Sequence, residues 1–279
     1  MLKIAVPNKG SLSETAVEML HEAGYAQRRD PRALSFRDER NDVEFFYLRP
    51  RDIATYVGSG ALDVGITGRD LLLDSDSPAR EVAALDFGES TFRFAGPPGR
   101  FADLADLEGV RIATSYPGLV RGFLRQRGVS AGIVTLDGAV ESAVRLGVAD
   151  AVADVVSTGA TLRAQGLEIF GPVILESVAV LISANPDLPG IATLQHRLEG
   201  VLVARQYVLI DYDVETRNLE AATRITPGIE SPTISPLHDP AWVAVRAMVP
   251  RSDANHVMDE LYAVGARAIL VTAIHAARI

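Results

Sequence analysis

The sequence predicts an α/β protein in which two similar lobes are followed by a smaller α+β domain. Short apolar runs alternate with stretches of helical periodicity, which is typical of strand–turn–helix units. This order of elements occurs twice within residues 1–178, and from residue 207 it changes to strand, helix, strand, helix, strand. Two α/β halves of this kind favour two lobes with a cleft at their strand ends.

The elements of the two halves follow from these patterns. The first half predicts strands at residues 2–6, 43–48 and 62–67 and helices at about 12–23 and 53–57. The second half predicts strands at 110–114, at 133–136 and from 151 onward, with one helix ending near 128 and another over about 139–146. The helix-to-strand joints Gly60–Asp63 and Gly147–Asp150 are also similar in sequence.

The remaining segments define the predicted domains. Residues 90–95 and 178–183 are apolar or alternating and are interpreted as crossings between the lobes. Beyond them, strands at 207–212, 241–249 and 268–274 alternate with two helices, and Thr233 and Ile234 suggest an additional edge strand, which favours a ferredoxin-like unit. We therefore expect lobe I at 1–90 plus 179–206, lobe II at 91–178, and a regulatory or assembly domain at 207–279.

Composition excludes several classes of protein. The 279 residues carry a net charge of −9, which makes general nucleic-acid binding unfavourable. There is no cysteine, so disulfides, zinc–thiolate sites and cysteine nucleophiles are excluded. The apolar start is too short for a signal peptide, and no apolar run is long enough to cross a bilayer. We expect a cytoplasmic protein without a membrane partner.

The segment from Asp154 to Thr161 is the most informative motif. It follows the apolar run 151–153 and ends in Ser157, Thr158, Gly159, Ala160 and Thr161. A buried strand that ends in such a turn presents backbone N–H groups and hydroxyls to a phosphate dianion. The carboxylate of Asp154 suits hydroxyl groups of the same ligand, so the motif predicts a sugar-phosphate site. The alternative is a strand end whose hydroxyl caps the next helix.

Charged residues also follow other predicted strands. Lys9, Arg49 and Arg51 come at the carboxyl ends of parallel strands, where α/β proteins bind ligands, and arginine suits polyphosphates. Each of them can also be an ordinary surface charge. Asp70 is a candidate ligand or a helix cap, and Tyr116 either faces a nucleobase or covers the hinge.

Other polar residues give weaker signals. Glu141, on the helix predicted over 139–146, is more often a solvated residue than a ligand. The histidines lack the spacing of metal ligands, and they do not assemble a convincing catalytic triad.

Residues 147–162 resemble the phosphoribosyl-pyrophosphate signature of the ATP phosphoribosyltransferase family. The resemblance extends to Pro7–Gly10, Gly65–Asp70 and Pro227–Thr233, and thus to nearly the whole chain. The last of these motifs and the extra C-terminal domain point to the long form that is regulated by histidine. In many relatives we expect lysine in place of Arg51. The resemblance implies a two-lobed catalytic region like that of periplasmic binding proteins, with a ferredoxin-like regulatory domain.

The resemblance also implies the reaction, in which adenine N1 of ATP attacks C1 of phosphoribosyl pyrophosphate and pyrophosphate leaves. Mg²⁺ is expected on the pyrophosphate, with no protein side chain as a dedicated metal ligand and no assigned catalytic acid or base. Two sets of binding residues follow. The phosphoribosyl-pyrophosphate set is Asp154, Ser157, Thr158, Gly159, Ala160, Thr161 and Glu141. The ATP and pyrophosphate set is Lys9, Arg49, Arg51, Asp70 and Tyr116.

Regulation is implied as well. The family is inhibited by histidine and changes between active homodimers and inhibited homohexamers. By similarity, the histidine pocket involves Asp213, Ile229, Ser231, Thr233 and Ala268.

Two other functions remain open from the residues alone. One is a phosphoribosyltransferase acting on a free base, although Val155 stands where such enzymes have a second acid. The other is a two-lobed small-molecule-binding protein, which would leave the phosphate loop unexplained.

Overall fold

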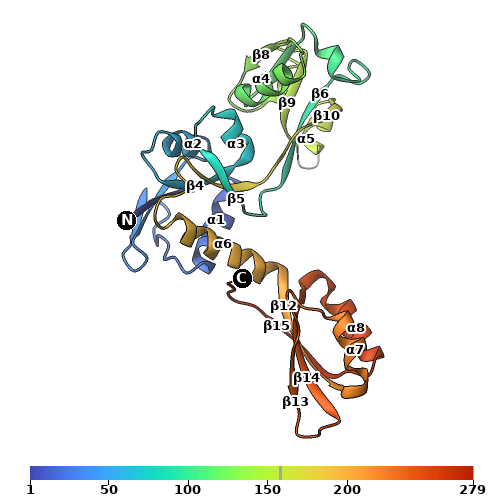
Figure 1. The fold of residues 1–279 in the computed structure, drawn as a ribbon. Coiled ribbons are helices and arrows are strands. Elements are labelled where there is room, and N and C mark those ends of the chain that lie inside the picture. The colour runs from blue at the N-terminus through green and yellow to red at the C-terminus, as the bar shows by residue number, and fades with distance from the viewer. Residues whose placement is uncertain (157–158, 279) are drawn as a thin grey trace. The chain divides into compact units, whose positions relative to one another are not determined.

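The computed structural model describes residues 1–156 and 159–278. The chain forms two compact units (Figure 1), of which the first holds residues 1–21 and 25–195 and the second holds residues 22–24 and 196–278. Helix α6 (Ile191–Gln206) runs through the division between Gln195 and His196. The lobe boundaries expected from the sequence stay predictions.

The N-terminal unit contains a six-stranded sheet in the order β2-β3-β1-β4-β11-β5, which we call the first lobe together with its helices. β1 is parallel to β3 and β4, whereas β2, β5 and β11 are antiparallel to their neighbours. The elements are β1 (Leu2–Pro7), α1 (Ser11–Glu22), β2 (Ser35–Asp38), β3 (Val43–Leu48), α2 (Pro50–Gly58), β4 (Val64–Gly68), α3 (Arg69–Asp74), β5 (Arg80–Ala84) and β11 (Ala179–Ser183).

A five-stranded sheet in the order β10-β6-β9-β7-β8 forms the second lobe. The chain enters this sheet after β5 and leaves it before β11, so two segments cross between the lobes, and the predicted two-lobed α/β class is confirmed. The elements are β6 (Ser90–Gly96), the 3₁₀ turn η1 (Leu104–Leu107), β7 (Arg111–Thr114), α4 (Pro117–Gln126), β8 (Gly132–Thr135), η2 (Val140–Ser142), β9 (Ala151–Val156), α5 (Ala160–Ala164) and β10 (Glu168–Ser177).

The two similar joints have the same structural role in the two lobes. Asp63 accepts a hydrogen bond from the backbone N–H of Lys3 on β1, at 2.7 Å. Asp150 accepts one from the backbone N–H of Arg111 on β7, at 3.2 Å. In both lobes, the carboxylate at the start of a strand therefore binds the first residues of the central parallel strand, which explains the recurrence of the sequence.

One predicted helix is wrong. Residues 139–146 form the 3₁₀ turn η2 followed by hydrogen-bonded turns, so Glu141 lies on a turn rather than on a helix. Val140 and Ala143 are buried, and a spacing of three residues fits a 3₁₀ turn as well as an α-helix. Ala139 and Gly147 adopt left-handed backbone angles at the two ends, which leaves little room for a regular helix.

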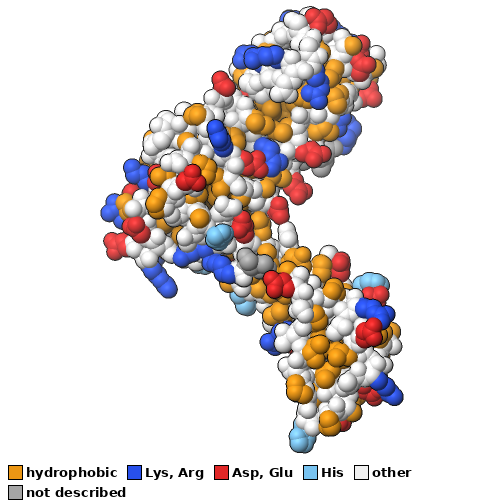
Figure 2. All heavy atoms as spheres, viewed as in Figure 1, with side chains coloured by type: hydrophobic (Ala, Val, Ile, Leu, Met, Phe, Trp, Pro, Cys, Tyr) orange, Lys and Arg blue, Asp and Glu red, His pale blue; other side chains and the backbone are white. Residues whose placement is uncertain are grey.

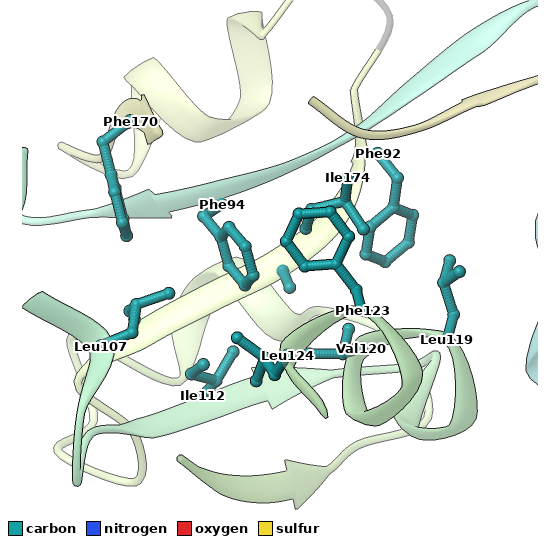
Figure 3. Packing of buried hydrophobic residues seen from close by; sticks show 12 residues of the cluster. Phe92, Phe94, Leu107, Ile112, Leu119, Val120, Phe123, Leu124, Phe170 and Ile174 are labelled. Carbon is teal, nitrogen blue, oxygen red and sulfur yellow. The ribbon is translucent and has the colours of Figure 1, made fainter. Parts of the chain in front are cut away.

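The core of the second lobe lies between one face of its sheet and helix α4. Figure 3 shows Phe92 and Phe94 of β6 pointing toward side chains of α4. The Phe94 ring lies 5.9 Å from that of Phe123 and 6.0 Å from that of Phe170. This packing fixes α4, and with it the turn that precedes α4, against the strand ends.

The C-terminal unit has the ferredoxin-like topology that the sequence predicts. Its sheet has the order β13-β14-β12-β15, with every pairing antiparallel. Val208, Ile210, Tyr212 and Val214 alternate along β12 and belong to a single buried cluster. The expected extra edge strand is present as β13. The elements are β12 (Tyr207–Glu215), the 3₁₀ turn η3 (Thr216–Asn218), α7 (Leu219–Ile225), β13 (Thr233–Pro236), β14 (Trp242–Pro250), the 3₁₀ turn η4 (Arg251–Asp253), α8 (Ala254–Ala263) and β15 (Arg267–Ala273).

The surface agrees with the composition. On the face drawn in Figure 2, acidic and basic side chains are interspersed rather than gathered into one basic patch. Within the described part of the chain, no helix is long and apolar enough to cross a membrane.

We predict that Phe94→Ala lowers the free energy of unfolding by about 3–5 kcal/mol, because a fully buried ring is removed and leaves a cavity. Urea unfolding followed by circular dichroism measures this change. Leu146→Ala is the control, since Leu146 is 73% exposed and its truncation opens no cavity. Equal stability of the two variants would contradict the role of Phe94 in the core.

Candidate functional site

The predicted site residues lie at the carboxyl ends of parallel strands. In the first lobe, Lys9, Arg49 and Asp70 follow β1, β3 and β4. In the second lobe, Tyr116 follows β7, and Asp154 lies near the end of β9, which is parallel to β7. Because parallel strands end at the same edge of a sheet, each lobe gathers its candidate residues at one edge.

The turns that carry Lys9 and Arg49 are neighbours. The backbone N–H of Asn8 donates to the carbonyl oxygen of Leu48, at 2.8 Å, so the two cationic residues start from adjacent points of the backbone. Both Lys9 and Arg49 are exposed. Pro50 occupies the first turn of α2 and stiffens the segment after Arg49. Two cations held this close suit a polyanion better than a single carboxylate.

Arg51 and Tyr116 meet at the junction of the two lobes. The guanidinium carbon of Arg51 lies 4.8 Å from the centre of the Tyr116 ring, within the range of a cation–π interaction. Phe92 packs against the same ring with a centroid distance of 5.0 Å. The ring of Tyr116 therefore contacts both lobes, which supports the interpretation that it covers the hinge.

Asp70 is a buried carboxylate with partners from two other segments of the chain. Ser177 Oγ donates to Asp70 Oδ1 at 2.9 Å and accepts from the Asp70 backbone N–H at 3.1 Å. The Tyr116 hydroxyl also hydrogen-bonds to Asp70. Burial, and then the charge of Asp70, raises the pKa of Tyr116 well above its usual range, so the hydroxyl stays protonated and donates. Asp70 thus joins the first lobe, the returning crossing segment and the second lobe.

Asp154 belongs to a group of acidic side chains. Burial raises the pKa of its carboxyl, and Glu141 and Asp70 raise it further through their negative charges. A hydrogen bond from the Val155 N–H, at 2.8 Å, acts in the opposite direction. Three carboxyl groups from η2, α3 and β9 are therefore close enough to interact. Such a group favours ligand hydroxyls, a developing positive charge or a cation that is carried by the ligand.

The phosphate-loop candidates are described only in part. Ser157 and Thr158 lie outside the described residues. Gly159 is buried, has a left-handed φ of +69° and precedes the first residue of α5. A Cβ at Gly159 would lie 3.1 Å from Nη1 of Arg163 and 3.3 Å from the side chain of Ile169, so glycine suits both the angle and the space. Ala160 and Thr161 are exposed in the first turn of α5.

A pocket of about 490 Å³ lies next to Val156, where the two crossing segments run. It is lined by Glu89, Ser90, Thr91, Val156, Glu176, Ser177 and Val178. Val156 immediately precedes the phosphate loop, and Ser177 is the partner of Asp70. The pocket is therefore bordered by a neighbour in sequence of the phosphate loop and by a hydrogen-bond partner of Asp70.

Sequence reasoning missed three residues of this region. Asp74, at the end of α3, pairs with Arg51 at 2.8 Å. Ser177 orients Asp70 from a position 107 residues away along the chain. The side-chain oxygen of Asn8 is buried without a hydrogen-bond partner among the described residues. Asn8 was visible as part of the first turn, whereas the other two depend on contacts that are remote in sequence.

The five candidate residues of the C-terminal unit are not brought into one pocket. Ile229, Ser231 and Thr233 line a pocket of about 520 Å³ with Leu209, Glu230, Arg246, Ala247, Met248 and Arg278. Asp213 instead lies on β12 opposite Arg267 of β15, at an irregularity in the pairing. Ala268 has a left-handed φ of 50° at the same place. Because β13 and β15 form opposite edges of the sheet, the candidates fall into two groups.

The raised pKa of Asp154 predicts that its ionisation costs stability. The folded state binds this proton more tightly than the unfolded state, so the free energy of unfolding falls as pH rises from the unfolded value of 3.8 through the raised folded value. At pH 7 we expect Asp154→Asn to raise the melting temperature of the N-terminal unit, by roughly 2–4 °C for each kcal/mol that the substitution adds to the free energy of unfolding. The gain should vanish below the unfolded pKa.

Asp150→Asn is the control, with the opposite sign. Hydrogen bonds from Arg111 lower the pKa of Asp150 to about 2, so its charge stabilises the fold above the unfolded pKa and this contribution is lost as pH falls toward 2. Calorimetry at several pH values measures both variants. If Asp154→Asn were less stable than the parent at pH 7, the conclusion that ionised Asp154 destabilises the fold would be wrong.

Comparisons with known proteins match the whole chain. The family model "ATP phosphoribosyltransferase" matches residues 49–200, and the model "HisG, C-terminal domain" matches residues 204–276. The chain is 63% identical to the ATP phosphoribosyltransferase of Arthrobacter sp. strain FB24 and 59% identical to that of Streptomyces coelicolor, with 100% of both chains covered in each case.

A solved structure agrees with these matches. The ATP phosphoribosyl transferase (HisG:HisZ) complex from Thermotoga maritima has a chain that aligns with a TM-score of 0.63 and 28% identity, covering 72% of this chain and 98% of that one. Two family models and full-length relatives thus match this chain, and it belongs to the ATP phosphoribosyltransferase family.

Proposed function

We propose that this chain condenses ATP with 5-phosphoribosyl 1-pyrophosphate to give N1-(5-phosphoribosyl)-ATP and pyrophosphate, the first step of L-histidine biosynthesis. Family membership over the full length supports this reaction. The observation that carries it is that residues at the strand ends of the two lobes interact, as Arg51 does with Tyr116. Asp154 and Asp70 interact electrostatically although they come from different lobes.

The phosphoribosyl donor occupies the second lobe. Residues 157–161 hold its 5-phosphate, and the support for this role is the left-handed Gly159 at the start of α5 together with the signature resemblance. Asp154 accepts hydrogen bonds from the ribose hydroxyls, with Glu141 nearby. A ligand that donates hydroxyl protons to Asp154 relieves the cost of burying its charge.

The triphosphate and pyrophosphate face the cationic residues of the first lobe. Lys9 and Arg49 are exposed on adjacent turns, and Arg51 stands beside Tyr116. Cations at these positions stabilise the negative charge that develops on the leaving pyrophosphate. Adenine N1 carries no proton to remove, so the reaction needs positioning and electrostatics rather than a strong base.

The acidic group stabilises the other half of the transition state. As the bond from C1 to pyrophosphate breaks, positive charge develops on the ribose ring. Asp154, Glu141 and Asp70 place negative charge near the expected ribose position. In a site with little water, this fixed charge favours the transition state over the uncharged ribose of the ground state.

Mg²⁺ fits this site as a partner of the substrate. Within residues 1–156 and 159–278, no group of three potential ligand side chains is suited to hold a metal ion alone. The raised pKa of Asp154 nevertheless indicates uncompensated negative charge that a cation would reduce. Bound to the pyrophosphate, Mg²⁺ would neutralise charge on the leaving group.

We also propose that histidine inhibits the enzyme through the C-terminal unit, and that the chain assembles into homodimers and homohexamers in the cytoplasm. Asp213 would hold the ammonium or imidazole group of histidine, and Thr233 its carboxylate. The candidate residues fall into two groups, one in the pocket beside β13 and the other on β12 and β15, which is the arrangement expected if neighbouring copies complete each site. A site shared between copies couples histidine binding to assembly.

The direct test is to incubate the protein with ATP, phosphoribosyl pyrophosphate and Mg²⁺ and to measure phosphoribosyl-ATP by chromatography and mass spectrometry. We expect product with ATP and none when free adenine replaces it. Product from adenine alone would support a free-base phosphoribosyltransferase instead. Binding of substrates without any turnover would support a binding protein.

Asp154→Ala and Thr161→Ala test the phosphoribosyl site. We expect each to lower kcat/KM for phosphoribosyl pyrophosphate by about 10²-fold or more, because a contact to the sugar phosphate is lost at the reacting centre. Thr193→Ala on the exposed face of α6 is the control and should behave like the parent. Parental turnover in both site variants would refute the assignment.

Thr233→Ala tests the regulatory pocket. We expect the histidine concentration for half-inhibition to rise about tenfold, since one charge-assisted hydrogen bond is removed, while turnover without histidine stays parental. A histidine titration measures both quantities in one experiment. Unchanged inhibition would place the effector outside this pocket.

A further inference from the structure

The lobes of the N-terminal unit touch where α3 ends and α4 begins. Asp74 is the last residue of α3, and Tyr116 directly precedes α4. Asp74 Oδ1 accepts hydrogen bonds from the backbone N–H of Gly118 at 2.8 Å and of Leu119 at 3.2 Å. A carboxylate here satisfies two amides of the first helical turn and complements the positive end of the helix dipole. The first lobe thus caps a helix of the second.

The other oxygen of the same carboxylate holds a candidate substrate residue. Asp74 Oδ2 lies 2.8 Å from Nη1 of Arg51, whose side chain is 46% exposed, while that of Asp74 is only 8% exposed. The guanidinium of Arg51 lies over the ring of Tyr116. Because the Asp74 side chain is buried and fixed by two backbone amides, it orients the guanidinium group of Arg51, whose other N–H groups can bind a ligand.

The backbones at this junction are too close for a side chain. A Cβ built at Gly118 would lie 2.3 Å from the carbonyl oxygen of Asp74, a backbone atom that cannot turn aside. Gly122, one turn further along α4, has no atom within 4 Å of such a Cβ. Glycine is therefore required at residue 118 by the contact between the lobes and not by the helix itself.

We propose that Asp74 is a positioning residue for the nucleotide, with one oxygen fixing the second lobe through α4 and the other presenting Arg51 to the phosphates of ATP. Asp74 itself does not contact substrate. The proposal rests on the proposed function in that Arg51 serves the nucleotide. Small displacements of a substrate-positioning group are costly to the rate, so a link of this kind matters even though it makes no contact with the reacting atoms.

Two variants separate the two oxygens of Asp74. Asp74→Asn keeps an acceptor for the α4 amides but turns an NH₂ group toward Arg51, so it should release Arg51 alone. Asp74→Ala removes both contacts. Asp76→Asn is the matched control, because it removes the same charge from an exposed residue just beyond the same helix.

The kinetic experiment measures KM for each substrate on the full-length chain. We expect Asp74→Asn to raise KM for ATP about tenfold or more and KM for phosphoribosyl pyrophosphate less than twofold, with Asp76→Asn parental. Gly118→Ala and Asp74→Ala should both disturb the contact between the lobes, whereas Gly122→Ala should resemble the parent. A parental KM for ATP in Asp74→Asn would overturn the proposal, as would an equal rise in both KM values.

A second measurement is independent of catalysis. The chain has no cysteine, so thiol-reactive spin labels attach only to cysteines that are introduced. We choose Tyr56→Cys on α2 and Leu146→Cys in the second lobe, because both residues are exposed. Labelled chains are diluted with unlabelled ones, and the distance distribution between the lobes is measured without substrates. We expect a parental distribution for Asp74→Asn and a broader or shifted one for Asp74→Ala and Gly118→Ala.

Parental distances in all three variants would remove the link between the lobes and overturn the proposal. If the parent chain formed no phosphoribosyl-ATP, the proposed function would fail, yet the distances would still test the link. If the parent were active and Asp74→Asn kept a parental KM for ATP, only the positioning role would fail. The two hypotheses are therefore distinguished.

Discussion

The arrangement of the site depends on the buried carboxylate of Asp70. Its partners, Ser177 and Tyr116, come from the returning crossing segment and from the second lobe. A buried carboxylate is stable only when hydrogen bonds satisfy its oxygens, so loss of any of these segments would leave an expensive unpaired charge. This requirement ties the end of β4 in the first lobe to Ser177 and Tyr116.

The same region trades stability for function. Asp154 is buried next to other carboxyl groups, and its raised pKa records that cost. An apolar or amide side chain would fold more easily there. In the function proposed above, the phosphoribosyl donor would offset this cost by supplying hydroxyl donors and a developing positive charge. Strain of this kind at a strand end is a better indication of function than the charge alone.

The two units of the chain differ in how they arrange their candidate residues. The N-terminal unit gathers residues from many distant segments at the ends of two sheets. The C-terminal unit is a simple antiparallel sheet with helices on one side, and its candidate residues fall into two groups, one beside β13 and the other on β12 and β15. A catalytic cleft can be completed within one chain, whereas a site divided between two such groups calls for a second copy. The proposed regulation by assembly is consistent with this difference.

The sequence by itself determined the strand–turn–helix order, the ferredoxin-like unit, the position of Asp154 near a strand end and the family. These features are local, because periodicity, glycine turns and contiguous motifs are visible along the chain. The tertiary structure decided that residues 139–146 form turns, that Ser177 orients Asp70, and that Asp74 joins Arg51 to helix α4. Such contacts are set by packing between segments up to 107 residues apart, and a single sequence carries no local signal for them.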